Sequence, residues 1–185
     1  STLAPGHLSE PEVWYAGSSP QGLFRSDDGG RSWKGVKGFN EHPKRFEWSA
    51  TSHDGIPNIA RLHSILVDPL DPNHMYISMS TGGVFESLDQ GKEWKPLNKG
   101  CATNSLPTGK TEYGHGPHNV QLHPLNSDRL YQQNDSGTYR MNRPEGQWIR
   151  IGGNIPKTVS DNGFSLLIDP QDPDSIWVFP MDDTK

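Results

Sequence analysis

The segment "GLFRSDDGGRSW", residues 22–33, occurs again with the same internal spacing as "GVFESLDQGKEW", residues 83–94, and as "GTYRMNRPEGQW", residues 137–148. Each copy begins with a glycine, has an aromatic residue two positions later, passes through a polar turn and ends at a tryptophan. Internal repeats of short strands with a period of roughly 40 to 50 residues are typical of propeller blades. The repeat therefore predicts an all-β chain of β-propeller blades, each with four antiparallel strands.

A second repeated element precedes the first one in each blade. It reads "HSILVDPLDPNHMYIS" from His63, "HNVQLHPLNSDRLYQQ" from His118 and "FSLLIDPQDPDSIWVF" from Phe164. Turn residues divide the best-defined copy into four expected strands, which are His63–Val67, His74–Ser78, Val84–Ser87 and Glu93–Leu97.

The chain is interpreted as a single partial propeller domain over residues 1–185, with blade segments at 10–37, 61–98, 117–152 and 163–180. The first blade is expected to lack its inner strand, because "TLAPGHLSEP" is a poor strand candidate, and the last blade has only its first two strands. About three blades plus partial ones form an incomplete ring, since a closed propeller has about four to eight blades. The expectation is either a segment of a longer protein or self-association that completes the ring.

Composition excludes several classes of partner. The net charge is −5 and the sequence contains no basic run, so a nucleic acid is not an expected partner. No apolar run reaches the roughly 20 residues of a spanning helix, and the first residues lack the basic start and apolar centre of a signal peptide. Cys101 is the one cysteine, so it forms no internal disulfide.

The segments "SDDGGRSW" and "SLDQGKEW" resemble the Asp-box of BNR repeats, and the wider text "HSILVDPLDPNHMYISMSTGGVFESLDQGKEW" resembles bacterial WD40/YVTN/BNR-like repeat proteins. Such repeats occur in sialidase-like β-propellers, in glycosyl hydrolase-like glucan hydrolases and in uncharacterised propellers. The resemblance implies a propeller fold, a ligand site in the central funnel and a bacterial cytoplasmic protein. It says little about activity.

The box residues are interpreted as structural. A short carboxylate accepts backbone N–H bonds within its own turn, glycine adopts the backbone angles that other residues resist, and tryptophan is buried between sheets. A calcium loop at Asp27 and Asp28 is the alternative, but alternating oxygen ligands and a distal glutamate are absent. No metal site and no cofactor are therefore expected. The structural set is Ser26, Asp28, Gly30, Ser32, Trp33, Ser87, Asp89, Gly91, Trp94 and Trp148.

Alternation of strand direction predicts that the box turns lie at one end of the blades and the blade-to-blade connections at the other, where the funnel opens. Long connections in compact domains are usually functional or disordered. His63 and His118 share one register position, with Phe164 in the last copy, so both histidines should border the funnel. A strand cap or a solvated loop is the alternative for each. The candidate ligand-binding residues are His63, His118, His115, Arg61, Trp48 and Tyr113.

Two functions follow from this arrangement. The favoured one is a non-catalytic scaffold that binds a glycan or a protein ligand at the long inter-blade connections. The alternative is a sialidase-like or glucan-hydrolase-like glycoside hydrolase whose other catalytic residues lie outside this segment. A glucan hydrolase of this fold would use two carboxylates about 5 to 10 Å apart, and the candidates are Asp54, Glu112 and Asp135.

Overall fold

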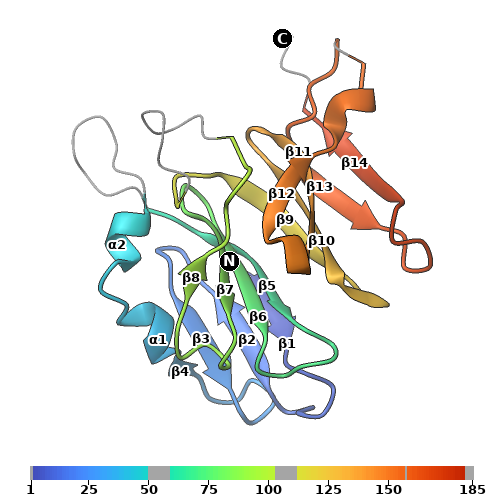
Figure 1. Cartoon of the computed structure of the whole chain (residues 1–185). Helices are drawn as coiled ribbons and strands as arrows, with labels where there is room; N and C mark the ends of the chain where they lie inside the picture. Colours follow the sequence, from blue (N-terminus) through green and yellow to red (C-terminus); the bar gives the residue numbers. More distant parts are fainter. Residues whose placement is uncertain (1, 50–58, 103–111, 157, 182–185) are drawn as a thin grey trace.

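The computed structural model describes residues 2–49, 59–102, 112–156 and 158–181, which form a succession of antiparallel sheets in chain order (Figure 1). Each of the first three sheets has four strands, in the order in which they occur in the sequence. Sheet 1 consists of β1 (Thr2–Pro5), β2 (Trp14–Gly17), β3 (Leu23–Ser26) and β4 (Lys34–Gly35). Sheet 2 consists of β5 (Leu62–Val67), β6 (Met75–Met79), β7 (Gly83–Ser87) and β8 (Lys95–Pro96).

Sheet 3 repeats this arrangement, and sheet 4 has two described strands. Sheet 3 consists of β9 (Pro117–His123), β10 (Asn126–Asn134), β11 (Gly137–Asn142) and β12 (Gln147–Arg150). Sheet 4 consists of β13 (Gly163–Ile168) and β14 (Ile176–Pro180). The described helices are short turns in the connections, namely α1 (Lys37–Asn40), α2 (Arg45–Trp48), η1 (Arg143–Glu145) and η2 (Gly152–Asn154).

The expectation that the first sheet lacks its inner strand is wrong. Residues Thr2–Pro5 pair antiparallel with Trp14–Gly17 over four residue pairs. This strand also packs beside β5 of the next sheet. A four-residue strand that contains a proline carries almost no local signal, so its long-range partners define it.

The first strands of successive sheets lie next to one another. β1 packs beside β5, β5 beside β9, and β9 beside β13. The sheets then bury their faces against each other, which produces one apolar cluster between sheets 1 and 2 and another between sheets 2 and 3. The centre of the first cluster includes Phe39, Trp48, Phe85 and Trp94, so large aromatics supply much of the buried area in a chain with only 31% hydrophobic residues.

The two ends of the sheets differ as the strand directions predict. At one end, the amide of Gln90 in the second box turn donates to the carbonyl of Asn73, at 2.8 Å. At the other end, the amide of Gly114 in an inter-sheet connection donates to the carbonyl of Gly82, at 3.1 Å. The box turns and the inter-sheet connections therefore lie at opposite ends. Within the described ranges, no helix has the length and apolar character needed to cross a membrane.

Candidate functional site

The adjacent first strands bring three repeat-equivalent side chains together. His63, His118 and Phe164 occupy the second positions of β5, β9 and β13. The ring centroids of His63 and His118 are 5.8 Å apart in an edge-to-face arrangement, and those of His118 and Phe164 are 4.1 Å apart. Side-by-side packing of equivalent strands thus converts a sequence repeat into a continuous row of rings.

A carboxylate joins this row from the turn between β10 and β11. Nε2 of His118 lies 2.6 Å from Oδ1 of Asp135. An ionised carboxylate only accepts hydrogen bonds, so Nε2 of His118 carries the proton and donates it. The amide of Asp135 donates to the carbonyl of Gly116 at 3.1 Å, which fixes the turn against the connection that leads into β9. We call the group of His63, His118, Asp135 and Phe164 the rim.

Burial controls the charge of His63. Its pKa is lowered from the usual 6.5, first by desolvation and then by the neighbouring His118 and Arg61, with Asp135 opposing them. The neutral imidazole is therefore favoured near neutral pH, and it can both donate and accept a hydrogen bond. The rim combines this neutral donor–acceptor with the acceptor oxygens of Asp135 and the apolar ring of Phe164.

A groove of about 370 Å³ runs along β5 and β9 beside the rim. His63 belongs to the wall of this groove, and most of the rest is backbone and side chains of the two inner strands. The lining residues are Thr2, His63, Ser64, Ile65, Leu66, Asn119, Val120, Gln121 and Leu122. The groove offers amide, hydroxyl and imidazole groups together with apolar side chains.

Three of the predicted ligand-binding residues lie in the protein interior. Trp48 is 1% exposed and packs against Phe39 and Phe85. Tyr113 is buried and its hydroxyl donates to Glu47 at 3.2 Å. His115 is buried with Nδ1 3.1 Å from the carbonyl of Ala102. The described parts of the long connections pack against the sheets, so these three side chains lie in the interior.

The remaining candidates are distributed over the same end of the sheets. Arg61 is exposed next to His63, and its amide donates to Oγ of Ser80 at 2.9 Å. Glu112 forms an ion pair with Lys44 at 3.5 Å. Asp54 lies outside the described residues. Of the two predicted catalytic carboxylates that the structure describes, Glu112 and Asp135, it is Asp135 that contacts the histidine row.

The first box turn is held by its own side chains. Asp28 accepts hydrogen bonds from the amide and the hydroxyl of Ser32, at 2.8 and 2.7 Å, and from the hydroxyl of Ser26 at 2.8 Å. These bonds, with the hydroxyl of Ser32 contributing most, lower the pKa of Asp28 to about 2. Gly30, with a φ of +88°, donates its amide to Oγ of Ser26 and accepts the indole N–H of Trp33.

The second box turn reproduces these contacts with different residues. Oγ of Ser87 donates to Asp89 at 2.9 Å and accepts the amide of Gly91 at 2.8 Å. The carboxylate of Asp89 accepts the amides of Lys92 and Glu93 at 3.0 and 2.9 Å. Both carboxylates are thus occupied by groups of their own turn. In the described part of the chain, no group of three or more His, Cys, Asp or Glu is arranged to hold a metal ion.

In the third turn, Arg143 stands at the position of the box carboxylate and contacts the neighbouring sheet. Nη1 of Arg143 donates to Oδ2 of Asp68 at 2.5 Å and to Nδ1 of His74 at 2.6 Å, both in the turn between β5 and β6 of sheet 2. Arginine only donates, so Nδ1 of His74 accepts and Nε2 donates to Glu86 at 2.7 Å. The imidazole of His74 thus lies between Arg143 of sheet 3 and Glu86 of sheet 2.

Comparison with solved structures identifies the architecture. The chain is similar to the GH74 xyloglucanase from Xanthomonas campestris, with a TM-score of 0.67 and 21% identity over 95% of this chain. The fold is that of β-propeller blades. An ancestral GH74 enzyme matches 91% of this chain, with a TM-score of 0.59 and 15% identity. YCF48 from Cyanidioschyzon merolae matches 85%, with a TM-score of 0.50 and 13% identity.

The matched portion of each of these β-propeller proteins is small. The chain spans 26% of the length of the xyloglucanase, 22% of the ancestral enzyme and 44% of YCF48. No protein-family model matches the chain, and the comparison with curated proteins found no match. Similar blades therefore occur both in the GH74 enzymes and in YCF48, so the fold does not specify the chemistry.

Proposed function

We propose that this propeller chain is a ligand-binding scaffold and that its ligand site is the rim with the adjoining groove. The observation that carries the proposal is the row of His63, His118 and Phe164 from three successive blades, with Asp135 hydrogen-bonded to the central His118. Nδ1 of His118 is buried without a hydrogen-bond partner in the described structure. A buried polar atom left without a partner is costly, so its retention supports a role other than packing.

The chemistry of the rim fits a neutral glycan. Phe164 is 54% exposed and offers the flat apolar surface on which a sugar ring stacks. The side chain of Asp135 is also exposed, and its oxygens can accept hydrogen bonds from sugar hydroxyls. Arg61 is the basic residue next to His63; a phosphorylated ligand would need a cluster of such charges.

The experiment is an NMR titration of the ¹⁵N-labelled chain with xyloglucan oligosaccharides and with neutral β-glucan oligosaccharides. Saturable shifts at residues 63, 118, 135 and 164 are expected, and they should be lost in Phe164→Ala and Asp135→Asn. Leu125→Ser is the matched control, because Leu125 is exposed in the β9–β10 turn, beyond the opposite end of β9 from His118. Unperturbed rim signals with every glycan would contradict the proposal.

Hydrolysis is the second candidate, and Asp135 is the observation that favours it. A carboxylate exposed at the rim and hydrogen-bonded to His118 has the position of a catalytic acid or base. A retaining or inverting glycosidase also requires a second carboxylate about 5 to 10 Å away. Release of reducing ends from xyloglucan that disappears in Asp135→Asn would establish hydrolysis, whereas binding without release would establish the scaffold.

A further inference from the structure

Three exposed leucines lie in the turns that join the first two strands of sheets 1, 2 and 3. Leu8, Leu70 and Leu125 are 88%, 79% and 78% exposed, in the β1–β2, β5–β6 and β9–β10 turns. β5 and β9 run from His63 and His118 of the rim toward these turns, so the leucines lie at the other end of the sheets. Sheets 2 and 3 each pack between two described sheets, so the exposure of Leu70 and Leu125 is a property of the turns themselves. We call these three turns the leucine turns.

The geometry of these turns does not require a leucine. In sheet 2, the amide of Leu70 donates to Oδ1 of Asp68 at 2.8 Å. In sheet 4, the amide of Gln171 makes the same bond to Oδ1 of Asp169, at 2.9 Å, so a polar residue serves the turn equally well. Exposed apolar side chains that gather between polar residues are typical of an interaction surface.

A cavity of about 300 Å³ opens between the leucine turns. Each of the three turns contributes to its wall, with Leu8 from the first, Pro69 from the second and Pro124 from the third. Most of the remaining wall is also apolar and comes from the inner strands, including Leu66 and Leu122. A partner can therefore bury an aliphatic side chain between the turns.

Contacts between the turns hold the walls of this cavity in place. Nε2 of His7 donates to the carbonyl of Pro69 at 2.9 Å, which joins the first turn to the second. Arg143 donates to Asp68 in the second turn, at 2.5 Å, and to Asp128 at the start of β10, at 3.2 Å. The surface is therefore preorganised, and preorganisation lowers the entropic cost of binding.

The turns that border the cavity carry negative charge. Residues 6–13 and 68–74, which form the first two leucine turns, contain four Asp or Glu and no Lys or Arg. Glu10 and Asp68 form ion pairs with arginines. Glu12 and Asp71 are exposed and take part in no ion pair within the described ranges. The exposed leucines are therefore accompanied by unpaired carboxylates.

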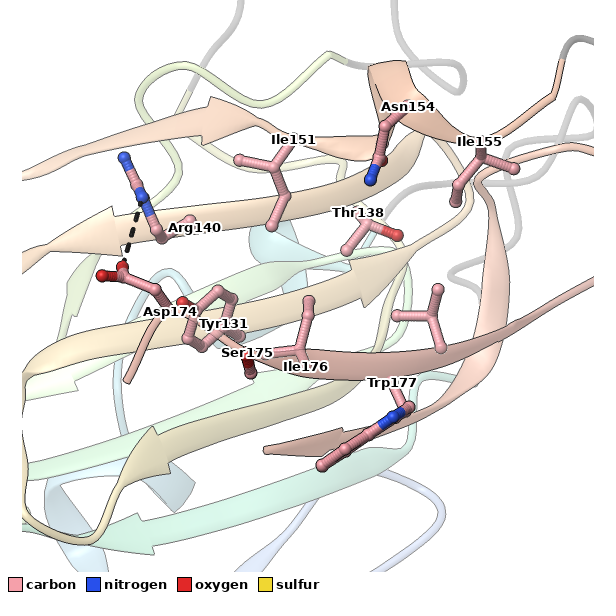
Figure 2. A pocket seen from close by; sticks show the side chains of 12 residues that line it. Tyr131, Thr138, Arg140, Ile151, Asn154, Ile155, Asp174, Ser175, Ile176 and Trp177 are labelled. Carbon is pink, nitrogen blue, oxygen red and sulfur yellow. Dashed lines mark ion pairs between the residues drawn. The ribbon is translucent and has the colours of Figure 1, made fainter. Parts of the chain in front are cut away.

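The β13–β14 turn of sheet 4 does not continue this surface. It has Gln171 in place of a leucine. Asp174 at the end of the turn forms ion pairs with Arg129 and with Arg140, and Figure 2 shows the second of these pairs, at 3.8 Å, beside a cavity between sheets 3 and 4. We therefore assign the surface to the turns of sheets 1 to 3.

We propose that the leucine turns and their cavity are a docking site for a basic amphipathic segment of a partner protein. An aliphatic side chain of the segment enters the cavity beside Leu8, and its lysines or arginines lie over Glu12 and Asp71. Complementary charge of this kind steers association and fixes the register of the two partners. A lipid bilayer is a poorer match, because its anionic leaflet repels carboxylates. The site is separate from the glycan site at the rim and does not depend on it.

The test is an NMR titration of the full ¹⁵N-labelled chain with a synthetic amphipathic helix of leucine and lysine. We expect saturable shifts of the amides of Leu8, Leu70 and Leu125, with the rim signals unchanged. A peptide with serine in place of each leucine should bind at least about tenfold more weakly. A peptide with glutamate in place of each lysine should also bind at least about tenfold more weakly. Absence of binding, equal binding of the three peptides, or shifts that map elsewhere would overturn the proposal.

Variants of exposed residues separate the apolar from the charged contribution. Leu8→Ser and, independently, Leu70→Ser should each weaken binding of the leucine–lysine peptide about tenfold. Leu88→Ser is the matched control and should retain binding, because Leu88 is exposed in the second box turn but does not line the cavity. Asp71→Asn combined with Glu12→Gln should weaken binding and make it less sensitive to salt. Binding that is the same in all of these variants would contradict the assigned surface.

Two further measurements distinguish the other occupants of an exposed leucine surface. In sedimentation of the chain alone, self-association that is abolished by Leu70→Ser would identify a second copy as the occupant. In flotation with phosphatidylcholine vesicles, binding that is abolished by Leu70→Ser would identify a bilayer. Either result would contradict a basic protein segment, for which we expect a chain that stays monomeric and does not float with the vesicles.

Discussion

Trp94 and Phe39 pack edge to face across the boundary between blades 1 and 2, with ring centroids 6.1 Å apart and planes inclined by 77°. Phe39 comes from helix α1 in the long connection, and Trp94 ends the second box turn. Trp48 also stacks on Phe39, with ring centroids 6.4 Å apart. The connection that was expected to carry the ligand surface therefore also supplies the aromatic core between two blades.

Truncation of Trp94 should be among the most destabilising single changes. Trp94→Ala removes a ring that is 3% exposed, so we expect a loss of about 3–5 kcal/mol in the free energy of unfolding. The equivalent Trp33 is 38% exposed because no described sheet precedes it, so Trp33→Ala should cost much less. Urea denaturation followed by circular dichroism measures both. Equal losses of stability for the two variants would contradict the claim that burial between two blades makes Trp94 more important than Trp33.

The hydroxyl of Ser32 in the first box turn is expected to control the pKa of Asp28. Ser32→Ala should raise the pKa of Asp28 from about 2 toward the usual 3.8, because the hydroxyl of Ser32 is the main cause of the lowering. The stabilisation from Asp28 is present above pH 3.8 and is lost as the pH falls through about 2. An NMR titration of side-chain carboxyl signals measures the change, and Asp89 in the second turn is the internal control that should not move. An unchanged pKa of Asp28 in Ser32→Ala would show that the hydroxyl of Ser32 does not cause the lowering.

Local repetition explains which features could be predicted from the sequence. The repeat fixed the alternation of strands and placed His63, His118 and Phe164 at one register position, and the structure brings their rings together. Sequence reasoning missed that Val36, Leu97 and Ile151, each three residues after a box tryptophan, have equivalent roles. Their amides donate to the carbonyls of Leu23, Val84 and Thr138. Repeated elements are predictable because each copy solves the same packing problem.

Features that depend on tertiary contacts could not be predicted in this way. Strand β1 is defined by its pairing with β2, not by its own residues. Trp48, Tyr113 and His115 lie in connections whose composition resembles a polar surface, yet their side chains are buried. The hydrogen bond between Asp135 and His118 joins residues 17 positions apart, and nothing in the repeat indicates it.

The contact of Arg143 with sheet 2 predicts a large effect from one substitution. Arg143→Met leaves the carboxylate of Asp68 buried without its partner, and we expect a loss of about 3–5 kcal/mol. The double variant Arg143→Met with Asp68→Asn removes the charge but keeps the Oδ1 atom that accepts the amide of Leu70, so its loss should be smaller. Urea denaturation of the three proteins provides the comparison. A double variant that is less stable than Arg143→Met alone would contradict this account.

His63 predicts the direction in which stability changes with pH. Its folded-state pKa lies below the unfolded value of 6.5, mainly because of burial, so the unfolded chain binds more protons between the two values. The free energy of unfolding should therefore fall as the pH decreases below 6.5, and the penalty is complete below the folded-state pKa. His63→Gln keeps a neutral polar side chain and should remove this part of the slope. Chemical denaturation at intervals between pH 7.5 and about pH 5 measures the slope, and an identical slope in His63→Gln and in the parent protein would mean that the imidazole of His63 titrates as it does in water.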